Sequence, residues 1–138
     1  MKDEQFNFIV KVSEFIQRFG VLTPVADWIG CQFAMESNYG QSRIARERNN
    51  FCGMKVPSIR PSLNTALSGF ASYDSFESCC IDYMLLLAYN RFGYNQLSDV
   101  ELFTLRLKAV NYCPEQDYIQ SITNLYNQFK NYRYAKRK

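Results

Sequence analysis

The chain has 138 residues, a formal net charge of +3, 47% hydrophobic residues and 16% aromatic residues. This length suits one domain with a buried core, and the composition excludes an intrinsically disordered chain. So mild a charge, spread over the whole sequence, gives no reason to expect a nucleic acid as partner. We also expect no membrane span, because no run of about 18 apolar residues occurs.

The first third of the chain predicts three helical segments. Residues 4–19 are rich in apolar side chains and predict the first helix. Residues 23–38 predict the second, with Thr23 as N-cap, a proline in the first helical position and Gly40 as the residue that ends it. Residues 42–48 predict a short helical turn.

Residues 51–73 differ from the segments around them. Two short runs, FCGMKV and SGFASY, flank a stretch that contains proline and serine, PSIRPSLNTAL. Short apolar runs separated by turn-forming residues favour strands. We therefore expect a small lobe here, built as a β-hairpin or as an irregular loop.

The second half carries two capping signatures. Asp74 and Ser98 are each followed three residues later by a glutamate, and each predicts the start of a helix. Pro114 opens a last helix, and residues from about 130 to 138 form a basic tail that we expect to be solvated. Since no linker or repeat interrupts these elements, the sequence predicts a single domain over residues 1–138, of α+β and mainly α class.

Five cysteines and the absence of histidine narrow the possible chemistry. The number is odd, the spacings match no disulfide framework, and no CxxC pair suits zinc. We expect small buried thiols in a reducing compartment, at Cys31, Cys52, Cys79, Cys80 and Cys113. Without histidine there is no Ser-His or Cys-His nucleophile pair, so acid–base chemistry must use carboxylates, tyrosine or lysine. No metal or other cofactor is expected.

Glu36 occupies an unexpected place on the second predicted helix. At about 100° per residue, it projects between Val25 and Ile29, in the middle of the apolar stripe. Asp27 projects to the opposite side, where a solvated acid belongs. A carboxyl group buried near the last turn of a helix has a raised pKa, because burial and the helix dipole both disfavour its charged form. A group that keeps its proton near neutrality is suited to act as a general acid.

The alternative interpretation is that Glu36 reaches out to solvent or pairs with a nearby arginine. Arg43, Arg46 and Arg48 all follow closely enough in the sequence to supply such a partner. Position alone does not decide between the two interpretations.

The sequence AMESNYGQSRIARERNNFCGMK resembles the signature of the bacterial glucosaminidase family of peptidoglycan hydrolases, which includes flagellar and autolysin-type N-acetylglucosaminidases. That signature reads A-x-E-S-x-W-G-x-S, then a short helix, then N-F-F-G-I-K. The matching residues of the first part are Ala34, Glu36, Ser37, Gly40 and Ser42, with Tyr39 in place of tryptophan, and the second part matches at residues 50–55.

Two further blocks agree with this family. GFASYDSFESCCIDY is similar to its F-R-x-Y-x-S-x-x-E-S-x-x-D-Y, and AVNYCPEQDYIQSI is similar to its Y-A-T-D-P-x-Y-A-x-K-I. The positions in register are Phe70, Tyr73, Ser75, Asp82 and Tyr83 in the first block, and Tyr112, Pro114 and Tyr118 in the second. The resemblance covers roughly residues 20–129.

The resemblance implies a lysozyme-like helical fold with a small β-hairpin lobe beside a sugar cleft. It implies cleavage of the β-1,4 bond after N-acetylglucosamine in peptidoglycan glycan strands, with Glu36 as the general acid that protonates the leaving oxygen. Gly53 would let the backbone approach the sugar or relieve a tight bend. The candidate substrate-binding residues are Tyr39, Asn50, Phe51, Gly53, Tyr73 and Tyr118. Asp82 and Tyr83, on an apolar helix, are interpreted as structural.

One departure from glycosidase chemistry leaves the mechanism open. Most glycosidases use two carboxylates, yet residues 56–73 contain no acid, and the nearest candidate is Asp74. The substrate's N-acetyl oxygen could act as nucleophile, or a single glutamate could serve a lytic transglycosylase. A third possibility is a module that binds glycan without cutting it.

The start of the chain, MKDEQFNFIVKV, does not read as a signal peptide. Peptidoglycan lies outside the inner membrane, so we expect action at the cell wall by a protein delivered without a cleaved leader. A phage endolysin or tail enzyme fits this combination, as does a wall-opening component of a secretion or conjugation machine.

Overall fold

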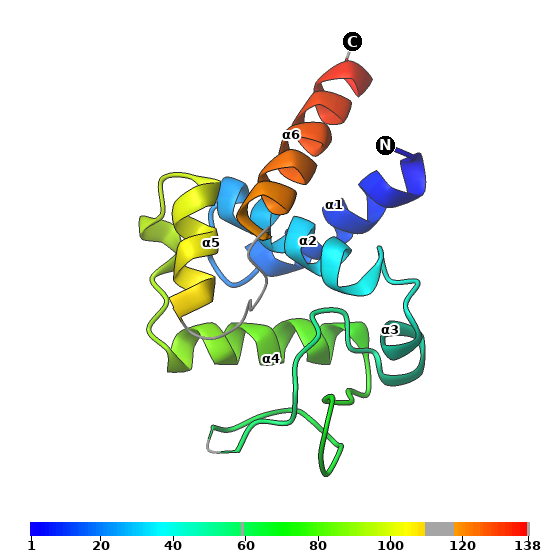
Figure 1. Ribbon diagram of the computed structural model, residues 1–138, viewed down its shortest axis with the longest axis vertical. Helices are drawn as coiled ribbons and strands as arrows, with labels where there is room; N and C mark the ends of the chain where they lie inside the picture. The colour runs from blue at the N-terminus through cyan, green and yellow to red at the C-terminus, as the bar shows by residue number, and fades with distance from the viewer. Residues whose placement is uncertain (59, 110–117, 138) are drawn as a thin grey trace. The chain divides into compact units, whose positions relative to one another are not determined.

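The computed structural model describes residues 1–58, 60–109 and 118–137, which are mainly helical (Figure 1). The elements are α1 (Asp3–Gln17), α2 (Thr23–Ser37), α3 (Arg43–Arg48), α4 (Phe76–Tyr89), the 3-10 turn η1 (Tyr94–Gln96), α5 (Val100–Ala109) and α6 (Tyr118–Lys136). None of the helices in these described ranges is long and apolar enough to cross a membrane.

The chain forms two compact units, and α2 runs from one into the other. The terminal unit contains Met1–Cys31 and Tyr94–Lys138, and the central unit contains Gln32–Gly93. Each unit has its own buried apolar side chains. The largest fully buried ones include Ile9, Ile16, Phe103 and Phe129 in the terminal unit, and Phe33, Tyr83 and Leu87 in the central unit.

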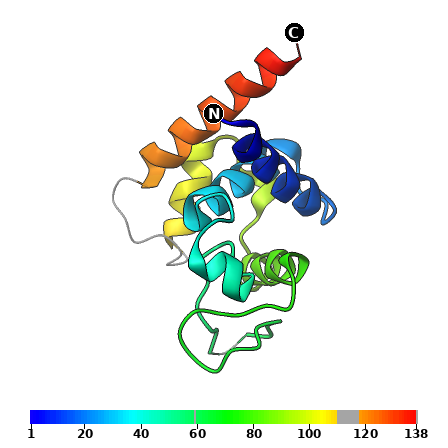
Figure 2. The same ribbon diagram turned by 90° about the vertical axis from the view of Figure 1, so that its right-hand side faces the viewer.

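Aromatic side chains join the helices of the terminal unit. The rings of Phe6 on α1 and Phe129 on α6 stack with their centroids 5.1 Å apart, and the two helices lie side by side in Figures 1 and 2. Trp28 on α2 contacts Phe103 on α5 and Tyr126 on α6, at 5.8 and 6.0 Å between centroids. Ring contacts of this kind stabilise a core beyond the area that they bury.

A glycine permits the closest approach of α1 and α2. A Cβ atom at Gly30 would lie 2.8 Å from the carbonyl oxygen of Ile9, too near for any side chain. The backbone of α2 therefore packs directly on α1.

The structure places Asp27 differently from the sequence-based expectation. Its side chain is only 3% exposed rather than solvated. It accepts a 2.7 Å hydrogen bond from the Ser13 hydroxyl and a 3.0 Å bond from Nη1 of Arg133. The prediction of a solvated acid was wrong because α2 is buried on every side along residues 25–34, so that it has no polar face at this level.

The prediction of a solvated basic tail holds for Lys130, Lys136 and Arg137, which are exposed, but not for Arg133. Residues 130–136 are helical, and Arg133 is part of the ion pair with Asp27. Lys136 donates to Oδ1 of Asp3 at 3.1 Å. Arg133 and Lys136 thus connect the last helix to α2 and α1 through two ion pairs.

The helix starts agree with the predictions to within a few residues, but two caps are shifted by one position. The N-cap of α4 is Ser75, whose hydroxyl accepts the Ser78 N–H at 3.0 Å, and not Asp74. Before α5, the Asp99 carboxylate accepts the Leu102 N–H at 2.9 Å, in place of Ser98. Each start offers two adjacent residues that can cap, and only the local backbone decides which one reaches the helical N–H.

The expected β-hairpin lobe is not seen. Within the described part of residues 51–73 there is no strand, only an isolated antiparallel bridge between Lys55 and Phe70. Asparagine side chains form hydrogen bonds with backbone groups that a β-ladder would otherwise pair. Oδ1 of Asn64 accepts the N–H groups of Ala66 and Ser72, each at 2.9 Å. A side-chain amide can satisfy backbone groups that a proline-containing loop leaves unpaired.

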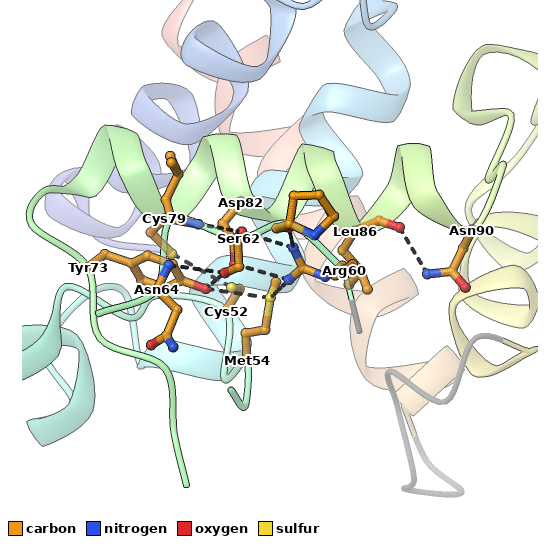
Figure 3. Close-up of polar contacts among 12 residues, drawn as sticks. Cys52, Met54, Arg60, Ser62, Asn64, Tyr73, Cys79, Asp82, Leu86 and Asn90 are labelled. Carbon is orange, nitrogen blue, oxygen red and sulfur yellow. Dashed lines mark hydrogen bonds and ion pairs between the residues drawn. The ribbon is translucent and has the colours of Figure 1, made fainter. Parts of the chain in front are cut away.

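A buried carboxylate ties this loop to α4 (Figure 3). Asp82 is fully buried and accepts two hydrogen bonds from Arg60, at 2.9 and 3.0 Å. It also accepts the Tyr73 hydroxyl at 2.6 Å and the Leu63 N–H at 3.2 Å. Burial alone would raise the pKa of Asp82, but the bonds from Arg60, Tyr73 and Ser62 outweigh it and hold the pKa below its usual range. The structural interpretation of Asp82 is confirmed.

We predict that Asp82→Asn lowers the free energy of unfolding by about 3–5 kcal/mol near neutral pH, because Arg60 is then buried without a counter-charge. The lowered pKa means that the wild-type carboxylate stabilises the fold above about pH 4, the unfolded value, and that this contribution disappears as the pH falls through the folded pKa. Urea unfolding at several pH values should show the two proteins converging in acid.

The matched control for this experiment is Asp74→Asn, at an exposed aspartate just before α4. We expect it to leave the stability nearly unchanged at every pH. An equal loss of stability in both variants would contradict the role given to Asp82.

Candidate functional site

Glu36, in the last turn of α2, is an exposed residue. Residues 25–34 are all buried, Met35 is half-buried, and Glu36 is exposed. The prediction that Glu36 is buried was therefore wrong. The residues on either side of it are covered, since Met35 is half-buried and Ser37 is 1% exposed. Burial therefore gives no reason to expect a protonated Glu36 in the unliganded protein.

The backbone turns sharply directly after Glu36. Asn38, Tyr39 and Gly40 all have positive φ values, of 47°, 56° and 81°. Two consecutive left-handed residues other than glycine are uncommon, and such strain persists only where the surroundings impose it. Ser37 imposes it here, because its hydroxyl donates to the Phe33 carbonyl at 2.7 Å and accepts the Gly40 N–H at 2.8 Å.

This turn leads at once into α3. The Ser42 N–H donates to the carbonyl of Ser37 at 2.9 Å, and the Ser42 hydroxyl accepts the Ala45 N–H as the N-cap. The two serines of the A-x-E-S-x-W-G-x-S signature thus have defined roles in ending one helix and starting the next. Together they fix the backbone turn between α2 and α3, which directly follows Glu36.

Gly53 lies against the carboxylate of Glu36. Its φ is +70°, and a Cβ atom at this position would lie 3.0 Å from Oε2 of Glu36 and 3.7 Å from its Cδ. The first and second parts of the family-like signature, separate in the sequence, therefore meet at these two residues. A glycine is required here for its conformation and for the space that it leaves to the glutamate.

Asn50 organises the loop that carries Gly53. Its Nδ2 donates to the carbonyls of Met54 and Ala71, at 2.8 and 2.9 Å, while its Oδ1 accepts the N–H groups of Met54 and Cys52. The side chain is 1% exposed. Asn50 was predicted to bind substrate; here its amide is bonded to backbone groups of the loop.

Tyr73 is also buried rather than open to a sugar. It is 3% exposed, and its hydroxyl donates to Asp82. Burial and this hydrogen bond raise the pKa of Tyr73 far above its usual range, so the hydroxyl remains a donor. Tyr73 was predicted to contact substrate; in this structure its side chain is part of the buried contacts around Asp82.

The other aromatic candidates have different surroundings. Tyr39 is half-buried in the strained turn after Glu36. Phe51 is half-buried, and its ring meets Phe76 edge-on with centroids 5.4 Å apart. Tyr118 is the first residue of α6, and its side chain lies outside the described part of the structure, as do Tyr112 and Pro114.

The three arginines considered as partners of Glu36 make other contacts. Arg43 pairs with Glu47 at 3.1 Å, Arg46 donates to the carbonyl of Gln41, and Arg48 donates to the carbonyl of Phe70. Two of these contacts fix α3 and its preceding turn, and the third connects α3 with the loop.

Sequence reasoning missed Arg60, the main partner of Asp82. A signal was available, because an aspartate on an apolar helix needs a cation or several donors when it is buried. Asp74, the candidate second acid, is exposed and has no capping role. Among the described residues, no group of histidine, cysteine, aspartate and glutamate side chains could hold a metal ion.

Two solved structures share this fold over most of the chain. One is a chain in the structure of a type VI secretion system effector–immunity complex from Pseudomonas protegens, with a TM-score of 0.71, 21% sequence identity and coverage of 94% of both chains. The other is the catalytic domain of the autolysin Auto from Listeria monocytogenes, with a TM-score of 0.68, 18% identity and coverage of 94% of this chain and 86% of that one. At these identities the likeness shows the fold alone, and it confirms the helical architecture that the resemblance predicted.

Comparison with curated protein sequences gives no match. The family model Glucosaminidase, described as mannosyl-glycoprotein endo-beta-N-acetylglucosaminidase, matches residues 15–131. This range contains Glu36, Gly53 and the three sequence blocks on which the resemblance rested. Since the match extends over most of its length, the chain belongs to the glucosaminidase family.

Proposed function

We propose that the protein is a peptidoglycan hydrolase that cleaves the β-1,4 bond after N-acetylglucosamine, with Glu36 as its general acid. The single observation that carries the proposal is the contact between the Glu36 carboxylate and the backbone of Gly53. This contact joins two blocks of a glucosaminidase signature around one exposed acid. A rigid, strained turn after Glu36 is also what a positioned catalytic group requires.

The exposed position of Glu36 suggests how it becomes an acid. In the free protein Glu36 is exposed near the C-terminal end of α2. A glycan strand laid over Glu36 would exclude water and raise its pKa in the complex. The proton would then be held at the carboxyl oxygen until it passes to the leaving glycosidic oxygen.

Around this acid, we propose Tyr39 and Phe51 as half-buried aromatic faces for the sugar rings, with Tyr118 as a further candidate. Because Gly53 has no side chain, the loop leaves room for a glycan to reach the carboxylate of Glu36. Asn50 and Tyr73 support the loop from inside and are not included among the proposed sugar contacts.

The nucleophile is the open part of the mechanism. The other acids of the central unit are Glu47, Asp74, Glu77 and Asp82. Glu47 is paired with Arg43, and Asp82 is buried under four donors. We therefore favour attack by the substrate's own N-acetyl oxygen, an established route for glycosidases with one acid. Asp74 is the alternative, since the observed cap at Ser75 removes the structural explanation for it.

We predict that Glu36→Gln lowers the rate of peptidoglycan cleavage by about 100-fold or more, because glutamine cannot donate the proton. Mass spectrometry of digested peptidoglycan should find products with reducing-end N-acetylglucosamine from the wild type alone. Glu47→Gln is the matched control, as an exposed glutamate of α3, and should retain activity.

The same digestion separates the alternatives. Anhydromuramic ends would identify a lytic transglycosylase, and bound but uncut glycan would identify a binding module. Asp74→Asn should retain most of its activity if the N-acetyl group is the nucleophile, and should lose it if Asp74 is the second acid.

We predict that Gly53→Ala displaces the Glu36 carboxylate and lowers the cleavage rate at least about tenfold, since small displacements of a catalytic group are costly. Gly69→Ala is the matched control, because Gly69 has a similar φ of +75° but open space where the methyl group would lie. Strain of about 1 kcal/mol should lower the Tm of both variants by a few degrees. Equal losses of activity would mean that strain alone, and not the contact with Glu36, explains the effect.

A delivery route is suggested by one of the structural neighbours. It comes from a type VI secretion system effector–immunity complex, and the match covers 94% of both chains. We propose that a secretion machine delivers this protein to the cell wall. Finding the protein in the wall fraction of unlysed cells that lack any such machine would contradict this prediction.

A further inference from the structure

Two cysteines from different segments meet in the central unit. The Sγ atoms of Cys52, in the loop, and Cys79, on α4, are 3.7 Å apart. Neither is part of a disulfide, and they are 1% and 0% exposed. Figure 3 shows the pair beside Tyr73 and Asp82, under α4. No large movement separates this arrangement from a disulfide, because the two sulfur atoms already face each other.

The pair lies beside the candidate site. Cys52 directly precedes Gly53, whose backbone lies against Glu36. The N–H of Phe51, on the other side of Cys52, donates to Sγ of Cys79 at 3.4 Å. Cys79 therefore already holds the loop at the residues next to Gly53, by weak contacts to sulfur. A covalent bond at the same place would fix that position far more firmly.

We propose that Cys52 and Cys79 are a redox-active thiol pair, which oxidises to an intramolecular disulfide that fastens the Gly53 loop to α4. This assignment concerns the sulfur chemistry and holds whether or not Glu36 is the catalytic acid. The odd number of cysteines and their spacing concealed the pair in the sequence, where buried thiols of a reducing compartment were expected.

The oxidant is a small-molecule or protein disulfide, such as oxidised glutathione. One protein thiolate attacks it, forming a mixed disulfide and releasing the oxidant's first sulfur as a thiol. The second protein thiolate then attacks the mixed disulfide, forming the bond between Cys52 and Cys79 and releasing the oxidant's other sulfur. The two protein sulfurs lose one electron each, and the oxidant's sulfurs gain both electrons and both protons.

The closed structure makes this reaction slow. The hydrogen bond with Cys52, followed by burial, raises the pKa of Cys79 well above its ordinary value, so the reactive thiolate is scarce. Oxidation therefore proceeds when the loop opens and exposes Cys52. The pair should stay reduced where glutathione keeps thiols reduced, and close slowly in an oxidising environment such as the one in which the proposed substrate lies.

Peptide mapping of the full chain tests the proposal. Wild-type protein is incubated with oxidised glutathione, the remaining thiols are alkylated after unfolding, and the peptides are identified by mass spectrometry. We expect a peptide pair linked through Cys52 and Cys79, lighter by two hydrogen atoms than its reduced parts. The oxidised protein should have a Tm higher by roughly 5–10 °C, because the bond constrains the unfolded chain.

The variants Cys79→Ala and Cys52→Ala should lose the linked peptide and the increase in Tm. Cys80→Ala, at the next residue of α4 and equally buried, is the matched control and should keep both. The map of the wild type remains decisive even if a variant folds poorly. All thiols alkylated after oxidation, or a link through Cys31, Cys80 or Cys113, would overturn the proposal.

Discussion

The buried carboxylate of Asp82 is the interaction on which the central unit depends. Asp82 joins the long irregular loop to α4 by charge, through Arg60, and by neutral donors, through Tyr73 and the Leu63 N–H. A loop without strands has few backbone bonds of its own to define its path. The carboxylate is a common acceptor for two stretches of the loop, residues 60–63 and Tyr73, so their relative positions become fixed.

Two asparagine side chains fix other parts of the loop, between the contacts of Asp82 and the candidate site. Asn64 holds the far part of the loop by accepting from Ala66 and Ser72, and Asn50 holds the near part around Met54. Gly53 lies in the near part, and its backbone reaches the carboxylate of Glu36 as a consequence. The acid itself is presented by another device, the strained turn that Ser37 stabilises at the end of α2. The end of α2 and a loop held by asparagine side chains thus meet at the exposed Glu36.

Much of the helical architecture could be predicted from the sequence, because apolar periodicity and helix-stop residues are local signals. The second helix, predicted over residues 23–38, is observed as Thr23–Ser37, and the turn at 42–48 is observed as Arg43–Arg48. The caps at Ser75 and Asp99 were missed by one residue, where two adjacent side chains could both have served. The hairpin was predicted from short apolar runs, yet prolines and asparagine side chains led to an irregular loop instead.

For the candidate site, the sequence by itself determined which groups are present: a glutamate before a helix break, a glycine in the following block, and no histidine for any other acid–base scheme. Only the tertiary structure decided which acids are buried. Asp27 and Asp82 lie inside with cations beside them, and Glu36 lies outside against Gly53. The physical reason is that periodicity gives the direction of a side chain around its helix, whereas burial also depends on the extent to which neighbouring elements cover that direction. That extent is set by segments remote in the sequence, as is the meeting of Cys52 with Cys79, so no local pattern could contain it.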